Sequence, residues 1–405
     1  MPAGNLEKLE YAIKYGADAV YLGVDDFSLR AMRKGNIITL DNLKQAVDLA
    51  HNLGAKAYLT LNIFAFNKDI KHLEECMEII KDSNPDAILV SDFGILRLLK
   101  KHMPDTDIHI STQTNILNYE CVKFWQDMGA TRVVLARELS IAEIAEIKQQ
   151  VPDMEVECFV HGAQCVSFSG RCLLSDYFTN GERISNQGNC CQPCRWSYKL
   201  VEETRPGEYY EVKQDARGSH ILSPKDLCLI EHLNELIEAG VDSFKVEGRT
   251  KSLYYVSAVA KTYRNAIDEV YDNPLANTSK YIKELKKVGN RGYTTGFALG
   301  KNPPDSYSYN LSKGLAGEDF LFEFKDKKKV DGEDRYLIKI KNRIYPEDEI
   351  EIITPYELYK TKIRGVYDLR GFELVVGNTN AEVYIKLDKN PKNYKYGLAR
   401  TTGKK

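Results

Sequence analysis

Residues 57–91 read AYLTLNIFAFNKDIKHLEECMEIIKDSNPDAILVS, and this stretch predicts the fold of the N-terminal part of the chain. Two short apolar runs, Ala57 to Asn62 and Ala87 to Ser91, enclose a segment from Ile70 to Ile80 with apolar residues three and four positions apart. This pattern predicts a strand, an amphipathic helix and a second strand. Nearly continuous apolar strands separated by helices are typical of a parallel sheet that is buried on both faces.

The same unit repeats along the chain in both directions. We expect further strands at residues 19–23, 108–112, 132–136, 156–160 and 243–247, and helices at 40–53, 226–239 and 251–271. A short run at 221–223 brings the number of strands to about eight, which predicts a (β/α)₈ or TIM-like barrel. The alternative is a doubly wound sheet, but no Gly-x-Gly-x-x-Gly sequence follows the first strand.

A polar, Gly-rich and Cys-rich segment at residues 162–220 interrupts this rhythm. It is far longer than an ordinary βα loop, and long loops in compact domains are usually functional. Because it directly follows a strand, we expect it at the carboxyl-terminal face of the barrel, where active sites lie. The barrel domain is therefore expected to span residues 1–272, with this segment as an insertion.

The pattern changes near residue 312, where short β-like runs alternate with charged or Gly/Pro/Asn turns. They predict a small all-β domain at 312–405, either a barrel or a sandwich. The polar segment 273–311 is expected to be a linker.

The composition is that of an ordinary globular protein, with 405 residues, 43% hydrophobic and 28% charged residues. A net charge of −2 neither requires nor excludes a nucleic-acid partner. There is no apolar run of the ~18 residues that a membrane helix needs. The first five residues, Met1 to Asn5, do not resemble a signal peptide, so we expect a cytoplasmic protein.

The cysteines are unevenly placed, since seven of the nine lie between Cys158 and Cys228. In a reducing compartment such a group indicates a metal or catalytic site rather than disulfides. Zinc sites usually have two short Cys-x₂₋₄-Cys pairs, and here only the run from Cys190 to Cys194 has that form. The wide spacing favours an iron–sulfur cluster. The candidate ligands are Cys165, Cys172, Cys190, Cys191, Cys194 and Cys228.

Polar residues at the ends of predicted strands are candidates for catalysis. Glu247, Arg249 and Lys251 follow one strand, and His161 ends another. In a barrel they would face the active-site end, where Arg249 could pair with a carboxylate and His161 could act as an acid or base. An ordinary salt bridge and a structural histidine are the alternatives.

Two further runs at strand ends, Ser111 to Asn115 and Arg137-Glu138, could line the same mouth. Neither a Gly-x-Ser-x-Gly sequence nor a His-Glu-x-x-His sequence is present, so the motifs of serine hydrolases and zinc proteases give no support to proteolysis.

Four motifs together resemble peptidase family U-32, the collagenase-like proteases. They are the runs from Glu157 to Ser175, from Asn186 to Arg195, from Ser223 to Cys228 and from Lys245 to Ser252. The resemblance covers the chain from residue 2 through the β domain. It implies an enzyme similar to the branch that hydroxylates the wobble uridine of tRNA to 5-hydroxyuridine, with prephenate as the hydroxyl source and a 4Fe–4S cluster.

The resemblance implies that Cys165, Cys172, Cys190 and Cys228 are the cluster ligands, with Cys194 as the alternative fourth ligand. Cys191 departs from the family pattern, which leaves the choice within 190–194 open. Family members usually begin with an apolar strand before Pro-Ala-Gly, whereas this chain starts at Met1-Pro2. A missing strand would weaken closure of the barrel, and a misassigned start codon would explain the same observation.

Two other functions remain open from the sequence alone. The family name implies a peptidase, and the cysteines are also compatible with a zinc-stabilised RNA-binding module. The resemblance names tRNA and a small-molecule hydroxyl donor as partners; a protein partner is neither indicated nor excluded.

Overall fold

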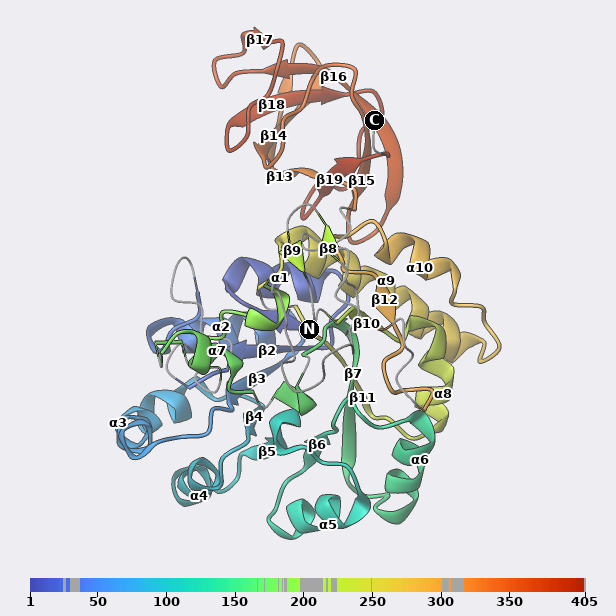
Figure 1. Cartoon of the computed structure of the whole chain (residues 1–405). Helices are drawn as coiled ribbons and strands as arrows, with labels where there is room; N and C mark the ends of the chain where they lie inside the picture. The colour runs from blue at the N-terminus through green and yellow to red at the C-terminus, as the bar shows by residue number, and fades with distance from the viewer. Residues whose placement is uncertain are drawn as a thin grey trace.

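The computed structural model describes residues 1–24, 27–29, 37–165, 167–170, 172–180, 182–183, 185, 188–196, 214–215, 218–219, 224–248, 250–300, 306 and 317–403. A large α/β domain makes up the N-terminal part, and a small all-β domain stands on one side of it (Figure 1).

Parallel strands form the wall of the N-terminal domain, and their order in the sheet follows their order in the chain. A doubly wound sheet would instead reverse its strand order at a switch point. Tyr21 donates a hydrogen bond of 2.9 Å to the Val246 carbonyl, so the last strand lies beside the first ones. The predicted (β/α)₈ barrel is confirmed. Its strands are β1 (Pro2–Ala3), β2 (Ala19–Gly23), β3 (Lys56–Leu61), β4 (Ala87–Val90), β5 (Asp107–Ile110), β6 (Arg132–Val134), β7 (Glu155–Ala163) and β11 (Ser243–Val246).

The first of these strands is short. Pro2–Ala3, which was expected to follow a missing strand, itself pairs in parallel with Tyr21 and Leu22 of β2.

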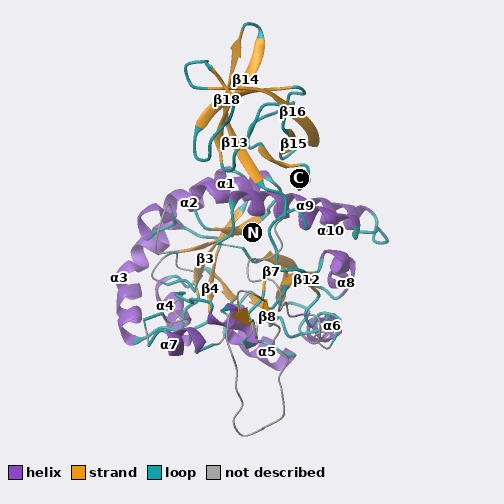
Figure 2. Cartoon of the chain, turned by 45° about the horizontal axis from the view of Figure 1, so that its top comes forward, coloured by secondary structure: helices purple, strands orange, loops and turns teal. Residues whose placement is uncertain are grey.

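Helices cover the outside of the barrel (Figure 2). Their ends follow ordinary capping rules: Asp92 accepts hydrogen bonds from the backbone N–H groups of Gly94 and Ile95, and Ser140 forms a capping box with Glu143. The amphipathic helices bury one apolar stripe against the strands, whereas α9 is buried all round from Leu253 to Ala260. The helices are α1 (Leu6–Lys14), α2 (Leu40–Asn52), α3 (Asn67–Ser83), α4 (Phe93–His102), α5 (Tyr119–Asp127), α6 (Ile141–Gln150), α8 (Leu233–Glu238) and α9 (Leu253–Asp272).

The helix predicted at 226–239 is only partly correct. Its first residues form β10 (Asp226–Cys228), which pairs antiparallel with β7, and the α-helix begins at Leu233. A short apolar run does not distinguish a strand from a buried helical segment, and here backbone pairing with β7 decides. The strand predicted at 221–223 lies outside the described residues.

The described part of segment 273–311, predicted to be a linker, carries regular structure. It contains α10 (Lys280–Leu285) and β12 (Tyr293–Thr294), and β12 pairs in parallel with β10. Leu285 and Val288 are buried in the barrel core. These residues therefore extend the barrel domain rather than connect two domains.

The C-terminal domain is a closed antiparallel β-barrel, one of the two architectures predicted for it. Its strands run in the order β15-β19-β13-β14-β18-β16, and β16 pairs back with β15. The domain has its own core, which includes Phe322, Tyr336 and Ile385. The strands are β13 (Phe320–Val330), β14 (Glu333–Ile340), β15 (Glu349–Ile353), β16 (Leu358–Tyr367), β18 (Glu382–Leu387) and β19 (Leu398–Thr401), with β17 (Glu373–Leu374) at the edge.

Arg400 joins the two domains. Its guanidinium is fully buried, donates to Glu351 of its own domain at 2.7 Å and donates to Tyr254 on α9 at 3.0 Å. Tyr15, which directly follows α1, donates to the Ile353 carbonyl at 2.9 Å. The β domain is therefore fixed against α1 and α9, at the side of the barrel rather than over its mouth (Figure 1).

No helix in the described ranges is both long and apolar enough to cross a membrane.

Candidate active site at the barrel mouth

A small cavity lies inside the barrel at the carboxyl ends of the strands, the face where barrel enzymes carry their active sites. Its volume is about 60 Å³, which is room for a few water molecules or one small group such as a carboxylate. Most of its lining residues have polar or charged side chains. The lining residues are Tyr21, Ser28, Leu29, Thr60, Asn62, Leu89, Ser111, Thr112, Gln113, Val134, Arg137, Phe159, Lys245 and Glu247.

Amide and hydroxyl groups form one side of the cavity. The Asn62 side-chain amide donates to Ser111 Oγ at 3.2 Å and to Gln113 Oε1 at 3.4 Å, and Ser111 also donates to Gln113. The backbone N–H of Leu29 donates to Asn62 Oδ1 at 3.2 Å, which fixes the orientation of that amide. This side therefore consists of neutral polar groups that hold one another in place.

Arg137, which follows β6, supplies a cation to the cavity lining. Its guanidinium carbon lies 4.0 Å from the centre of the Phe159 ring, and one of its N–H groups donates to the Ala163 carbonyl at 2.9 Å. Stacking on an aromatic ring holds a guanidinium in place. Arg137 is thus a positioned positive group at the mouth, as the sequence suggested.

A buried ionic network lies below the cavity. Glu157 pairs with Lys245 and with Arg132, the latter at 3.3 Å, and accepts a hydrogen bond from Ser243 at 2.8 Å. Burial opposes ionisation of Glu157, but Lys245 and Arg132 outweigh it and hold the pKa of this carboxyl at about 2. The carboxylate is therefore charged at neutral pH, and it fixes the Lys245 side chain, which also lines the cavity.

Glu247 lies at the mouth, as expected from its place at the end of β11. Its backbone N–H donates to the His161 carbonyl at 2.8 Å, and its own carbonyl accepts from Tyr255 at 3.1 Å. Gly162 has a φ of 107°, and a Cβ at this position would collide with the Glu247 carbonyl oxygen. The glycine after His161 therefore allows β7 and β11 to approach closely beside the site.

Of the two predicted catalytic cations that follow Glu247, the structure describes one. Arg249 lies outside the described residues. Lys251 is half-buried, with its Nζ 3.8 Å from Asp226 Oδ2 and 5.0 Å from the centre of the Tyr255 ring. It is not among the residues that line the cavity, so its expected catalytic role has no support from this geometry.

His161 lies in the wall of the barrel and faces away from the cavity. Where β7 pairs with β11, Lys245 is opposite Phe159 and Val246 is opposite His161, so Val160 is an extra residue that forms a β-bulge. After this bulge the side chains of β7 change the face to which they point. The His161 ring lies among three tyrosines, and its Nδ1 is 3.3 Å from the Tyr263 hydroxyl. Burial, assisted by Lys251, lowers its pKa to about 3. His161 is therefore a neutral wall residue in this structure.

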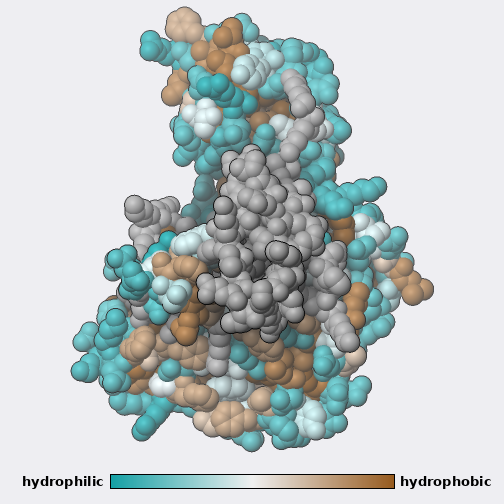
Figure 3. All heavy atoms as spheres, in the orientation of Figure 1, coloured by the Kyte–Doolittle hydropathy of each residue, from teal (hydrophilic) through white to brown (hydrophobic). Residues whose placement is uncertain are grey.

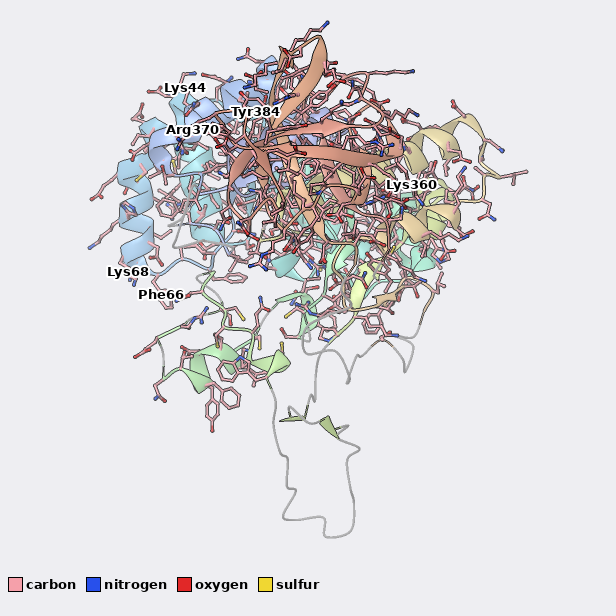
Figure 4. The ribbon with its side chains drawn as sticks, turned by 90° about the horizontal axis from the view of Figure 1, so that it is seen from above. Lys44, Phe66, Lys68, Lys360, Arg370 and Tyr384 are labelled. Atoms are coloured by element: carbon pink, nitrogen blue, oxygen red, sulfur yellow. The ribbon has the colours of Figure 1, made fainter. Side chains whose placement is uncertain are left out.

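The cysteine segment, residues 164–196, leaves the mouth at the end of β7. Figure 4 shows α7 (Leu174–Phe178) of this segment beyond one end of the barrel, on the side where Phe66 and Lys68 lie. Cys165 and Cys190 are exposed, and Cys172, Cys191 and Cys194 are half-buried.

Glu138 ties this segment to the mouth. Its carboxylate accepts hydrogen bonds from the Ser169 backbone N–H at 2.8 Å and from Ser169 Oγ at 2.5 Å. Ser169 lies between Cys165 and Cys172 and has a left-handed backbone with a φ of 42°. Glu138 directly follows Arg137, so the cavity and the cysteine segment share one anchoring point.

A second contact orders the far end of the segment. Ser175 on α7 accepts a hydrogen bond from the Cys191 backbone N–H at 2.9 Å and donates to the Arg183 carbonyl at 2.7 Å, and its Oγ lies 3.2 Å from Cys191 Sγ. The run from Cys190 to Cys194 is thereby held against the helix that begins just after Cys172. Cys191, which departs from the family pattern, has a local structural role in this contact.

Cys228 occupies a different environment. It is buried in β10, paired with His161 across the ladder, and its Sγ lies 3.9 Å from the Tyr263 hydroxyl. Burial raises the pKa of this thiol to about 11. Among the described residues no three His, Cys, Asp or Glu side chains converge on a common point, so the structure does not bring the predicted ligands together.

Several residues at the site escaped the sequence analysis. Asn62 was placed at the end of a predicted strand without a role, and Thr60 and Phe159 were assigned only to strands. Their position at strand ends is a signal that could have found them, because every strand end of a barrel reaches the same mouth. Lys245 and the contact between Glu138 and Ser169 depend on pairing across the fold and leave no local signal.

The features described so far define a class of protein: a (β/α)₈ barrel with a cysteine segment at its mouth and a β-barrel attached at its side. Two family models match the chain, Peptidase family U32 over residues 4–307 and Peptidase family U32 C-terminal domain over residues 318–399. The chain belongs to peptidase family U32 and is an enzyme of that family, as the sequence motifs predicted.

Similar proteins cover both domains. The chain is 38% identical over 394 residues to tRNA hydroxylation protein P of Escherichia coli, which covers 87% of this chain and 85% of that protein. It is 36% identical over 394 residues to tRNA hydroxylation protein P1 of Bacillus subtilis, covering 96% and 91% respectively. It is also 33% identical over 313 residues to a protein named collagenase from Porphyromonas gingivalis, covering 74% and 73%.

Proposed function

We propose that this enzyme hydroxylates the wobble uridine of tRNA to 5-hydroxyuridine, with prephenate as the hydroxyl source and a 4Fe–4S cluster as cofactor. The observation that carries the tRNA assignment is the similarity to tRNA hydroxylation proteins, which extends over 87% and 96% of the chain and includes both domains. The cysteine segment at the barrel mouth supports the cofactor assignment.

The cysteines of the segment suit an iron–sulfur cluster by type and exposure. Cys165, Cys172, Cys190 and Cys194 are exposed or half-buried, so a soft metal can reach their sulfur atoms. Cys228 is buried in β10, with its Sγ 3.9 Å from the Tyr263 hydroxyl. The fourth ligand is therefore either Cys228, as the resemblance implies, or Cys194 of the segment. Bound to these residues, the cluster would supply electron-transfer chemistry.

The cavity suits part of an anionic donor. Arg137 lines it and can attract a carboxylate, the group that prephenate carries. The cavity volume of about 60 Å³ fits such a group rather than the whole molecule.

Proteolysis has less support from this site. The described residues that line the cavity include serines and threonines but no histidine, and His161 is neutral and faces α9. A nucleophile without a neighbouring base lacks the usual activation. The name of the collagenase relative suggests a peptidase as the second candidate function. If this chain is a peptidase, the purified protein should still cleave peptides after its metal has been removed.

Complementation of a bacterial strain that lacks its own tRNA hydroxylation protein tests the proposal. Mass spectrometry of tRNA nucleosides should show 5-hydroxyuridine restored by the wild-type chain and by Cys121→Ala, since Cys121 is exposed on α5 outside the segment. Cys165→Ala should restore none. An unchanged nucleoside profile with well-expressed wild-type protein would contradict the proposed function.

A further inference from the structure

The outer face of the C-terminal barrel carries aligned cations and aromatic rings. Leu337 of β14 pairs with Tyr384 of β18, and Tyr384 pairs in turn with Tyr367 of β16, so these side chains form one row across the strands. Lys328 of β13 pairs with Arg335 of β14. The adjacent residues Tyr336 and Ile385 are fully buried, so this row faces outward.

Two of these cations lie against rings instead of carboxylates. Lys328 Nζ lies 3.6 Å from the centre of the Tyr384 ring, and the Arg335 guanidinium carbon lies 3.8 Å from the centre of the Tyr367 ring. Each cation reaches across one intervening strand to its ring. Among the ion pairs formed by the described residues, neither Lys328 nor Arg335 takes part.

Other cations of the same domain are neutralised. Arg364 contacts Glu347 at 3.2 Å and Asp388 at 2.8 Å, and Lys386 contacts Glu333 at 2.7 Å. An aromatic ring positions a cation while leaving its charge available, whereas a carboxylate cancels it. The outer face therefore presents two fixed positive charges that remain available to an anionic partner.

Exposed apolar side chains lie in the turn at one end of this row. Tyr367 pairs with Glu373 of β17, and in the turn before β17 the Phe372 side chain is 68% exposed. The neighbouring Leu369 is 59% exposed. Figure 3 shows hydrophobic residues at the tip of the domain, where Figure 1 places β17, and Figure 4 labels Tyr384 of the row. Fixed cations and aromatic rings on one surface are the combination that binds single-stranded or looped RNA.

We propose that this outer face, defined by Lys328, Arg335, Tyr367, Tyr384 and Phe372, binds the tRNA substrate outside its anticodon stem-loop. The proposal rests on the proposed function. The cations would contact backbone phosphates, and Phe372 would stack on an unpaired base. Because the face belongs to the domain fixed beside α1 and α9, it is separate from the barrel mouth. A tRNA extends well beyond its anticodon loop and can contact both places.

Binding measurements on the full chain test this assignment. Fluorescence anisotropy would give the Kd of wild-type protein, Lys328→Ala/Arg335→Ala and the matched control Lys386→Ala/Arg364→Ala for an intact tRNA and for its isolated anticodon stem-loop. We expect the first double variant to bind intact tRNA about tenfold more weakly, with a smaller salt dependence. Its affinity for the stem-loop should stay unchanged, and the control should resemble wild type for both RNAs.

Three outcomes would overturn the assignment. In the first, Lys328→Ala/Arg335→Ala binds intact tRNA as tightly as wild type. In the second, this variant loses equal affinity for intact tRNA and for the stem-loop. In the third, the control variant Lys386→Ala/Arg364→Ala loses as much affinity for intact tRNA as Lys328→Ala/Arg335→Ala does. Phe372→Ala gives an independent check that removes no charge: it should weaken binding of intact tRNA without changing the salt dependence. If the wild-type chain restores 5-hydroxyuridine in cells while these variants bind normally, only the RNA face is wrong. If wild type restores none, the proposed function itself fails.

Discussion

Glu138 and Ser169 are 31 positions apart in the chain, yet one carboxylate of Glu138 accepts both the backbone N–H and the hydroxyl of Ser169. The contact holds Ser169 in a left-handed conformation, which is costly for a residue other than glycine. It lies between the first two cysteines of the segment and next to Arg137 at the cavity. The position of the cysteine segment therefore depends on a barrel residue.

Removal of this contact should release the segment without unfolding the barrel. We expect Glu138→Ala to lose most 5-hydroxyuridine formation in the complementation assay and to become more sensitive to protease within the segment. The free energy of unfolding should fall by only about 1–3 kcal/mol, the cost of breaking hydrogen bonds to a charged group. Glu146→Ala, at an exposed position on α6, is the matched control. Normal modification by Glu138→Ala would show that the contact is dispensable.

The buried network around Glu157 should make the barrel sensitive to acid. The folded pKa of about 2 lies below the ordinary value of 4.5, so the ionised carboxylate stabilises the fold above pH 4.5. This stabilisation, about 3 kcal/mol, is lost as the pH falls from 4.5 to 2.

Glu157→Gln tests this dependence, because it removes the charge and keeps the shape. At pH 7 the variant should be less stable by about 3–5 kcal/mol, since Lys245 and Arg132 lose their buried partner. Urea unfolding at several pH values should show the difference between wild type and variant shrinking below pH 4.5. A difference that does not change with pH would argue against an ionised Glu157.

Arg400 should couple the two domains. Arg400→Ala removes a fully buried guanidinium and leaves Glu351 without one of its cations, so we expect the free energy of unfolding to fall by about 3–5 kcal/mol. Calorimetry should then show two transitions in place of one, because α9 loses its contact with β19. Arg364→Ala, on the outer surface, should unfold like wild type. A single unshifted transition in Arg400→Ala would mean that other contacts hold the domains together.

The sequence predicted the features that depend on local pattern. Apolar runs such as Ala87 to Ser91 became strands, since near-continuous burial leaves few alternatives, and the β-like runs after residue 312 became a closed barrel. The local sequence pattern gave a wrong prediction where backbone pairing between distant segments determines the secondary structure. Asp226 to Cys228 reads as the start of a helix but forms a strand against β7.

The site was less predictable than the fold, because it depends on pairing and on side-chain direction. From its position at a strand end, His161 was expected to face the active site. One extra residue, Val160, turns its side chain away from the cavity. Glu247, Ser111 and Arg137 do line the cavity, since a strand end without a bulge points where the alternation predicts. The joint role of Glu138 and Ser169 arises from a contact between distant segments, which no local pattern encodes.

Metal analysis of anaerobically purified protein tests most directly whether the cysteine segment holds a 4Fe–4S cluster. Wild type and Cys121→Ala should each contain about four iron and four sulfide per chain. Cys165→Ala, Cys172→Ala and Cys190→Ala should each lose most of both, and so should one of the two variants Cys194→Ala and Cys228→Ala, the one that removes the fourth ligand. Zinc without iron or sulfide in the wild-type protein, or full iron content in Cys165→Ala, Cys172→Ala and Cys190→Ala, would contradict a cluster held by this segment.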